Sequence, residues 1–213
     1  MNRLAARCLT TAALLPGLLA VPALAEPPAA AAAPSPLRQA VVDRAERALT
    51  TSHAYRETRN GPRKWSTPGD ARHDNYLGGA DRNEYNGFNG DYWCGYFAAA
   101  MWNNRRATPD NYKSSRAWET GVGDRFHAYR PGRPPQRGDV IVWHNHNRRD
   151  PEGHVAVVVA VGGSGGRTVV TIEGNAGRGS DSITRREYRW AGTDGPRIPT
   201  NPGLKLRGFA SRS

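Results

Sequence analysis

Apolar residues recur at helical spacing in two stretches of the chain. In residues 37–50, the apolar residues that share one face are Leu37, Val41, Ala45, Ala48 and Leu49. Ser35 and Pro36 precede this stretch in positions typical of a helix start. A second run begins at Cys94, and its apolar face comprises Phe97, Ala98, Met101 and Trp102. The spacing predicts two helices in the first half of the chain.

The second half has a different pattern, with short runs rich in β-branched residues. The sequence predicts strands over residues 138–143, 154–161, 167–173, 182–190 and 204–209. The segment GGSGG joins the second and third runs as a hairpin would. Residues 58–91 are rich in Gly, Asn, Asp and Arg, which predicts a loop. Helices followed by an antiparallel meander indicate an α+β fold.

The N-terminus carries the pattern of an export signal. Arg3 and Arg7 precede an apolar run that ends in small residues, so residues 1–25 are expected to be a signal peptide. Prolines and a glycine interrupt the run, which argues against a membrane span. Cys8 precedes the run, whereas a lipoprotein cysteine would follow it. Residues 26–36 are expected to be a Pro/Ala tether, followed by a single domain over 37–213.

The charge of the chain is strongly positive. The formal net charge is +11 at pH 7 and falls by two when Arg3 and Arg7 leave with the signal peptide. Lysine occurs only at positions 64, 113 and 205, so arginine supplies most of the charge. The excess of arginine can be explained either by a GC-rich genome or by binding to an anionic partner. For an exported protein, cell-wall polymers or anionic lipid are more plausible anionic partners than nucleic acid.

Once the signal peptide is removed, Cys94 is the only cysteine, so no internal disulfide can form. Cys94 stands at a predicted helix start, where a thiol pKa falls and a backbone N–H is free to stabilise an oxyanion. The alternative is that Cys94 packs in the core. His154 stands at the start of a predicted strand, where a rigid element would hold its ring. The two residues together favour a thiol nucleophile with a histidine base.

A histidine base needs a group that orients its ring. The third strand ends in TIEGN, so regular alternation places Glu173 and Asn175 on the same face. Antiparallel pairing through GGSGG would bring that end back to His154. Either side chain could accept a hydrogen bond from the imidazole, and we favour Glu173 because a carboxylate also stabilises the imidazolium. Taken alone, the segment would be more typical of a turn with a solvated Glu and a turn-forming Asn.

A metal site is a weaker hypothesis. His144 and His146 end the preceding strand and could form a metal pair with His154, Asp150 or Glu152. H-x-H without a third ligand at a set spacing is typical of a polar loop as well as of a zinc site.

Five segments of the chain resemble the CHAP domain, the family of cysteine- and histidine-dependent amidohydrolases and peptidases that is related to NlpC/P60 enzymes. The matching segments, which span roughly residues 60–210, are WCGYFAAAMW, RGDVIVW, GHVAVVVAV, TIEGNA and LRGF. The resemblance implies a papain-like arrangement with Cys94 as nucleophile, His154 as base, and Glu173 and Asn175 as the groups that orient it. Many members have glutamine before the cysteine, where this chain has Trp93, so a second oxyanion donor is unassigned.

Some relatives bind calcium through acidic residues ahead of the cysteine. In this chain, residues 81–91 offer the oxygen ligands Asp81, Asn83, Asn86, Asn89 and Asp91. The segment lacks the terminal bidentate glutamate of an EF-hand loop, and its composition is that of ordinary turns. We therefore expect that no cofactor is required, with structural calcium as the alternative.

The resemblance implies a secreted, monomeric hydrolase that cleaves amide bonds of peptidoglycan, either as an N-acetylmuramoyl-L-alanine amidase or as an endopeptidase. The expected partner is the cell wall or its peptides, not nucleic acid, and no membrane span is expected. The alternative function is a wall-binding module without catalysis on the same scaffold. A cationic membrane-active protein is disfavoured because helix 37–50 carries charges of both signs.

Overall fold

The computed structural model describes most of residues 35–212. The described ranges are 35–51, 55–56, 63–64, 74–76, 83–87, 89–145, 152–163, 167–177, 180, 182–189, 195, 198, 201 and 203–212. The expected signal peptide and nearly all of the tether lie outside these ranges, as do Asp81, His146 and Asp150. The described residues belong to the compact unit formed by residues 33–213.

The two predicted helices and the predicted later strands are present, but three short strands lie between the helices. The helical elements are α1 (Pro36–Thr51), α2 (Cys94–Trp102), α3 (Ala117–Thr120) and the 3-10 turn η2 (Gly123–Arg125). The strands are β1 (Tyr55–Arg56), β2 (Arg63–Lys64), β3 (Asp74–Tyr76), β4 (Phe126–Ala128), β5 (Val140–His144), β6 (Gly153–Gly162), β7 (Thr168–Ala176), β8 (Ser182–Arg189) and β9 (Lys205–Ala210).

The main sheet is antiparallel and contains seven of the described strands in the order β3-β8-β7-β6-β5-β9-β4. Strands β5 to β8 form the predicted meander, and β6 and β7 are the arms of the predicted hairpin. The expectation that residues 58–91 form only a loop is wrong, because β3 pairs with the edge strand β8 and β2 pairs with β1. These short strands depend on pairing with distant residues, which local composition does not reveal.

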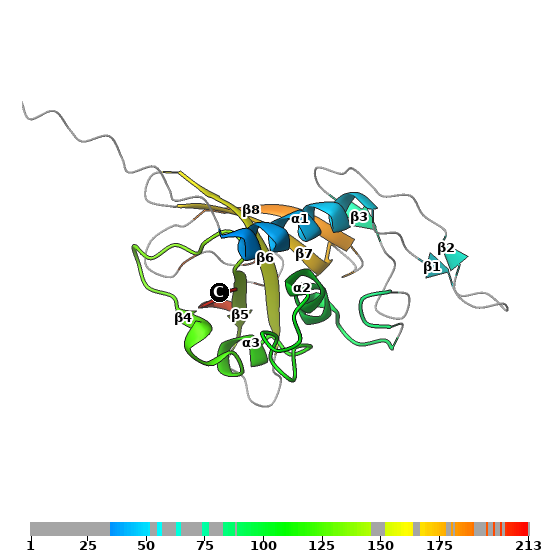
Figure 1. Cartoon of the computed structure of the whole chain (residues 1–213), viewed down its shortest axis with the longest axis horizontal. Helices are drawn as coiled ribbons and strands as arrows, with labels where there is room; N and C mark the ends of the chain where they lie inside the picture. Colours follow the sequence, from blue (N-terminus) through cyan, green and yellow to red (C-terminus); the bar gives the residue numbers. More distant parts are fainter. Residues whose placement is uncertain are drawn as a thin grey trace, which may run out of the picture. The chain divides into compact units, whose positions relative to one another are not determined.

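Helices α1 and α2 pack on one face of this sheet (Figure 1). Their apolar faces meet alternate residues of β5 and β6, namely Val140, Val142, Val155, Val157 and Val159. The opposite face carries a second apolar cluster around Trp143, with Ile198 and Leu204 from the segment before β9. Two covered faces explain why the central strands are apolar at nearly every position.

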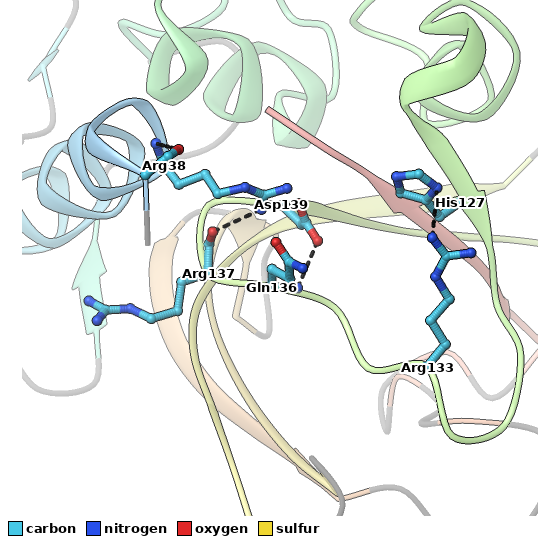
Figure 2. A network of polar contacts seen from close by, with 7 residues as sticks. Arg38, His127, Arg133, Gln136, Arg137 and Asp139 are labelled. Carbon is cyan, nitrogen blue, oxygen red and sulfur yellow. Dashed lines mark hydrogen bonds and ion pairs between the residues drawn. The ribbon is translucent and has the colours of Figure 1, made fainter. Parts of the chain in front are cut away.

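A buried ion pair joins α1 to the turn before β5. Arg38 Nη1 donates to Asp139 Oδ1 at 2.5 Å and to the carbonyl oxygen of Arg137 at 3.1 Å (Figure 2). The backbone N–H of Gln136 also donates to this carboxylate, at 2.7 Å. Burial raises the pKa of Asp139, although the charge of Arg38 opposes the shift. The first helix is therefore held in place by polar contacts as well as by its apolar face.

Among the described helices, none is long and apolar enough to cross a lipid bilayer.

Candidate active site

Cys94 is the first residue of α2, as the sequence predicts. The residue before it, Trp93, accepts the first backbone hydrogen bond of the helix from Phe97 at 2.9 Å. Gly95 allows the helix start to lie against residues 112–113, because a Cβ at Gly95 would stand 2.0 Å from the carbonyl oxygen of Tyr112. The thiol is thus held at the positive end of a helix dipole, beside N–H groups that have no partner within the helix.

Trp93, which replaces the glutamine of many CHAP domains, is a packing residue. Its side chain is completely buried, and its ring stacks on Tyr85 with centroids 5.8 Å apart. Its only polar group, the indole Nε1–H, donates to the carbonyl oxygen of Ser180 at 3.1 Å. The side chain of Trp93 therefore has no donor left for an oxyanion.

His154, the second residue of β6, lies between Cys94 and Glu173. Its Nε2 is 3.0 Å from Glu173 Oε2, and its interaction with the Cys94 thiol raises the pKa of the ring. Trp143 stacks on the imidazole from the neighbouring strand, with ring centroids 6.2 Å apart. The ring is therefore fixed by a charge on one edge and by packing on one face.

Glu173 is 1 % exposed, and its side-chain hydrogen bonds to described residues are all to groups at the same site. Its Oε1 accepts from the hydroxyls of Thr171 and Tyr188, both at 2.7 Å, and its Oε2 faces His154. Arg186 adds an ion pair at 3.6 Å, which exceeds a hydrogen-bond distance. A buried carboxylate with this many partners has a fixed position.

The three groups shift one another's pKa values toward a fully charged site. Burial alone would raise the pKa of Cys94, but the hydrogen bond and charge of His154 outweigh it, and the pKa falls below the ordinary thiol value. Burial would lower the pKa of His154, but Cys94 and Glu173 raise it to about 10. Burial would raise the pKa of Glu173, but the hydrogen bond and charge of His154 outweigh this effect, and the pKa is lowered. The favoured state is thiolate, imidazolium and carboxylate.

Asn175 does not follow the regular alternation that the sequence predicts. The pairing of β7 with β8 shifts between Glu173 and Ala176, and Asn175 has a left-handed φ of 58°. Between Glu173 and Asn175, Gly174 packs directly under α2, since a Cβ there would lie 2.5 Å from Phe97 Cβ. Asn175 still lines the site, and its buried Oδ1 has no hydrogen-bond partner among the described residues. Glu173, and not Asn175, contacts the imidazole.

A cavity of about 440 Å³ opens over these residues. Its lining includes Cys94, His154, Glu173 and Asn175. Exposed Tyr92 stands at the same cavity, together with Ser114 and Ser115. A substrate group that enters this cavity can therefore meet the thiol, the imidazole and several hydrogen-bonding side chains.

Four side chains at this site are missing from the sequence-based prediction: Trp143, Thr171, Arg186 and Tyr188. Thr171 stands two residues before Glu173 on the same strand, so the period-two pattern could have identified it. Tyr188 and Arg186 come from β8, and only the pairing of β7 with β8 brings them to Glu173. The sequence around Trp143 does not distinguish it from other buried strand residues, and only the structure shows that its ring stacks on His154.

His144 belongs to a separate histidine–glutamate pair. Its Nε2 contacts Glu119 of α3, and Arg207 of β9 donates to the same carboxylate at 2.9 Å. The partners of His154 are Cys94 and Glu173, so His144 and His154 do not interact with the same carboxylate. The described residues contain no group of three or more His, Cys, Asp or Glu side chains placed to hold a metal. Of the rest of the hypothetical metal set, Glu152 accepts from Asn201 Nδ2 at 2.9 Å, and His146 and Asp150 lie outside the described residues.

In the described part of the hypothetical calcium loop, three side-chain oxygen atoms bond to the protein itself, one each from Asn83, Asn89 and Asp91. Asn83 Oδ1 accepts from the backbone N–H of Tyr85, and Asn89 Oδ1 accepts from that of Asp91. The Asp91 carboxylate accepts from Tyr96 Oη at 3.1 Å and pairs with Lys113 at 3.2 Å. Asn86 donates from its side-chain nitrogen to the carbonyl oxygen of Asp91. These contacts suit a turn that is folded by its own side chains.

The model of the CHAP domain family matches residues 84–175 of this chain. No curated protein and no solved structure matches it. The matched range begins within the loop before α2 and ends at Asn175, so it contains Cys94, His154 and Glu173.

Proposed function

We propose that the protein is a cysteine hydrolase that cleaves amide bonds of peptidoglycan, because the CHAP domain family model matches residues 84–175 of the chain. The observation that carries the proposal is the row of contacts from Cys94 through His154 to Glu173 at an open cavity. In the proposed site, Cys94 is the nucleophile and His154 is the acid and base. Glu173 orients the imidazole and stabilises its protonated form. Asn175 is proposed to contact substrate, since its buried oxygen lacks a partner among the described residues.

The proposed reaction starts from the thiolate–imidazolium pair. The Cys94 sulfur attacks the amide carbonyl carbon, and the resulting oxyanion is stabilised by the Cys94 backbone N–H at the start of α2. His154 gives its proton to the leaving amine, the C–N bond breaks, and a thioester forms. His154 then takes a proton from water, which attacks the thioester and releases a carboxylate and the thiolate. Glu173 stays ionised throughout and stabilises the charge on the ring.

The substrate, the location and the finer fold are parts of the same proposal. Peptidoglycan is supported by the CHAP domain, and the export signal expected in residues 1–25 would deliver the enzyme to the wall as a secreted monomer. The positive charge suits an anionic polymer. The papain-like arrangement is supported by a cysteine at a helix start that faces a histidine on the sheet. Cleavage at the glycan–peptide amide and cleavage within the peptides are both compatible with this site.

The test compares wall hydrolysis by three variants of the full-length chain. Cys94→Ala and His154→Ala should lose essentially all clearing of a peptidoglycan suspension, because each lacks a reacting group. His127→Ala is the matched control, since His127 lies in β4 and contacts Arg133 at 3.5 Å away from the cavity (Figure 2). It should clear the suspension like the unmodified protein.

Mass spectrometry of products from defined wall fragments identifies the bond that is cut. A muramoyl lactyl carboxylate with a free peptide amine would show an amidase, and two peptide fragments would show an endopeptidase. Clearing by Cys94→Ala at the original rate would contradict the proposal. Tight binding of wall fragments without any product would instead indicate the binding module.

A further inference from the structure

Arg186 lies at the cavity with an incomplete set of partners. It belongs to β8, opposite Thr171 of β7, and its side chain lines the same cavity as Cys94 and His154. Its Nε is buried and has no hydrogen-bond partner, and no other hydrogen bond of its guanidinium occurs within the described part of the chain. A guanidinium carries five N–H donors, so this side chain retains unused donors at the wall of the cavity.

Glu173 cannot satisfy these donors. Its Oε1 already accepts from Thr171 and Tyr188, and its Oε2 faces His154 at 3.0 Å. Arg186 Nε remains 3.6 Å from Oε2, close enough for the charges to attract but too far for a hydrogen bond. Glu173 therefore holds the guanidinium near the cavity without using its donors.

The other charged side chains of the cavity have partners of their own. Lys113 is paired with Asp91 at 3.2 Å, and its side chain is 54 % exposed. Glu152 is exposed and accepts from Asn201 Nδ2 at 2.9 Å. Arg186 is only 21 % exposed, and a guanidinium matches a carboxylate through two parallel hydrogen bonds. Of these groups, Arg186 is the one placed to recognise an anion.

We infer that Arg186 binds a carboxylate of the substrate, close to the amide that Cys94 attacks. This inference rests on the proposed function, and it makes the substrate an acidic peptide rather than a neutral one. Arg186 is thus a residue that determines specificity, while Glu173 fixes both the imidazole and the guanidinium. Converting that carboxylate to a carboxamide removes its charge and leaves an N–H group facing the guanidinium donors.

The test is a binding experiment, so it does not depend on turnover. The full-length Cys94→Ala variant is titrated by calorimetry with a disaccharide-tetrapeptide from the wall and with the same fragment after amidation of its carboxyl groups. The acid form should bind about 10-fold more tightly or better, as expected for a charge-assisted hydrogen bond in a partly buried site. Adding Arg186→Gln should remove the preference, and Arg186→Lys should keep part of it.

Arg185→Gln is the matched control. Arg185 is the neighbouring residue of the same strand, but it pairs with Glu46 of α1 at 2.7 Å on the other face of the sheet. This variant should keep the full preference for the acid form. Melting temperatures of all variants check that the fold is intact, and Arg186→Lys retains the charge if Arg186→Gln proves unstable.

Equal binding of the acid and amidated fragments to the protein that retains Arg186 would overturn the inference, and so would absence of binding by both. A merely structural role for Arg186 would make Arg186→Gln weaken the binding of both fragments by the same factor and leave the preference for the acid form unchanged. A different result would contradict the proposed function alone. In that case, the unmodified chain would cleave neither fragment but would still bind the acid form more tightly.

Discussion

Replacing Glu173 with glutamine removes one charge from the centre of the site and leaves its shape nearly unchanged. The hydroxyls of Thr171 and Tyr188 can rotate to accept from an amide N–H, and the amide oxygen can still accept from His154 Nε2. The main loss is therefore the ionic part of the interaction with the imidazolium. A hydrogen bond to a charged group contributes about 1.5–3 kcal/mol and a neutral one about 0.5–1.5 kcal/mol. The difference of about 1–2 kcal/mol corresponds to a fall in kcat of roughly 5- to 30-fold.

The assay is steady-state hydrolysis of a soluble wall fragment, with the His154 proton followed by ¹⁵N–¹H NMR of the imidazole. Glu173→Gln should lower kcat more than it changes KM, and the pKa of His154 should fall below its value of about 10. Glu119→Gln is the matched control, because it disrupts the other Glu–His pair without touching the cavity.

Two results would refute this reasoning about Glu173. The first is a Glu173→Gln variant whose kcat stays within about 2-fold of the original, since that change is smaller than the loss of any charged hydrogen bond. The second is a Glu119→Gln variant with an equal fall in kcat. Either result would mean that the charge of Glu173 does not act through His154.

Two further predictions concern pH and metal. Iodoacetamide should label Cys94 faster than a model thiol at mildly acidic pH, because the pKa of the Cys94 thiol is lowered. Above pH 10 the labelling should persist, whereas hydrolysis should fall because the imidazolium of His154 loses its proton. A thiol that reacts only after denaturation would contradict this, as would hydrolysis that stays undiminished well above pH 10. EDTA should leave activity and melting temperature essentially unchanged, because Asn83 and Asp91 already bond to protein groups and a thiolate needs no Lewis acid. Loss of activity that calcium alone restores would direct attention to Asp81, Asn83 and Asp91, and restoration by zinc to His144 and His146.

The order of elements and the central pairing could be predicted from the sequence because their signals are local. Alternation and turn residues define β5 to β9 within a few residues, and the glycine-rich link between β6 and β7 predicts their hairpin. Cys94 and His154 stand out for the same reason, since each begins an element that can be identified from its own neighbourhood. The strand β3 could not be predicted in this way, because its three residues are held only by the distant β8.

The choice between Glu173 and Asn175 depends on a departure from regular structure. Perfect alternation would give both side chains the same access to His154, so the sequence favours Glu173 by its charge alone and not by its position. The irregularity in the pairing of β7 with β8, and the tight packing of Gly174 under Phe97, separate them. Both causes involve residues far away in the sequence, so the different positions of the two side chains could not be predicted from the sequence.

The two Glu–His pairs of this fold show that residue types alone do not make a site. Each pair joins a histidine near one end of a central strand to a carboxylate that also has an arginine partner, Arg207 for Glu119 and Arg186 for Glu173. Only the pair at His154 meets a thiol at a helix start and borders the cavity. Burial and the charge of Glu173 also raise the pKa of Tyr188, so its phenol stays protonated and keeps donating to that carboxylate. The chemistry proposed for this chain therefore depends on where α2 begins relative to β6, a relation that packing sets and that neither element determines alone.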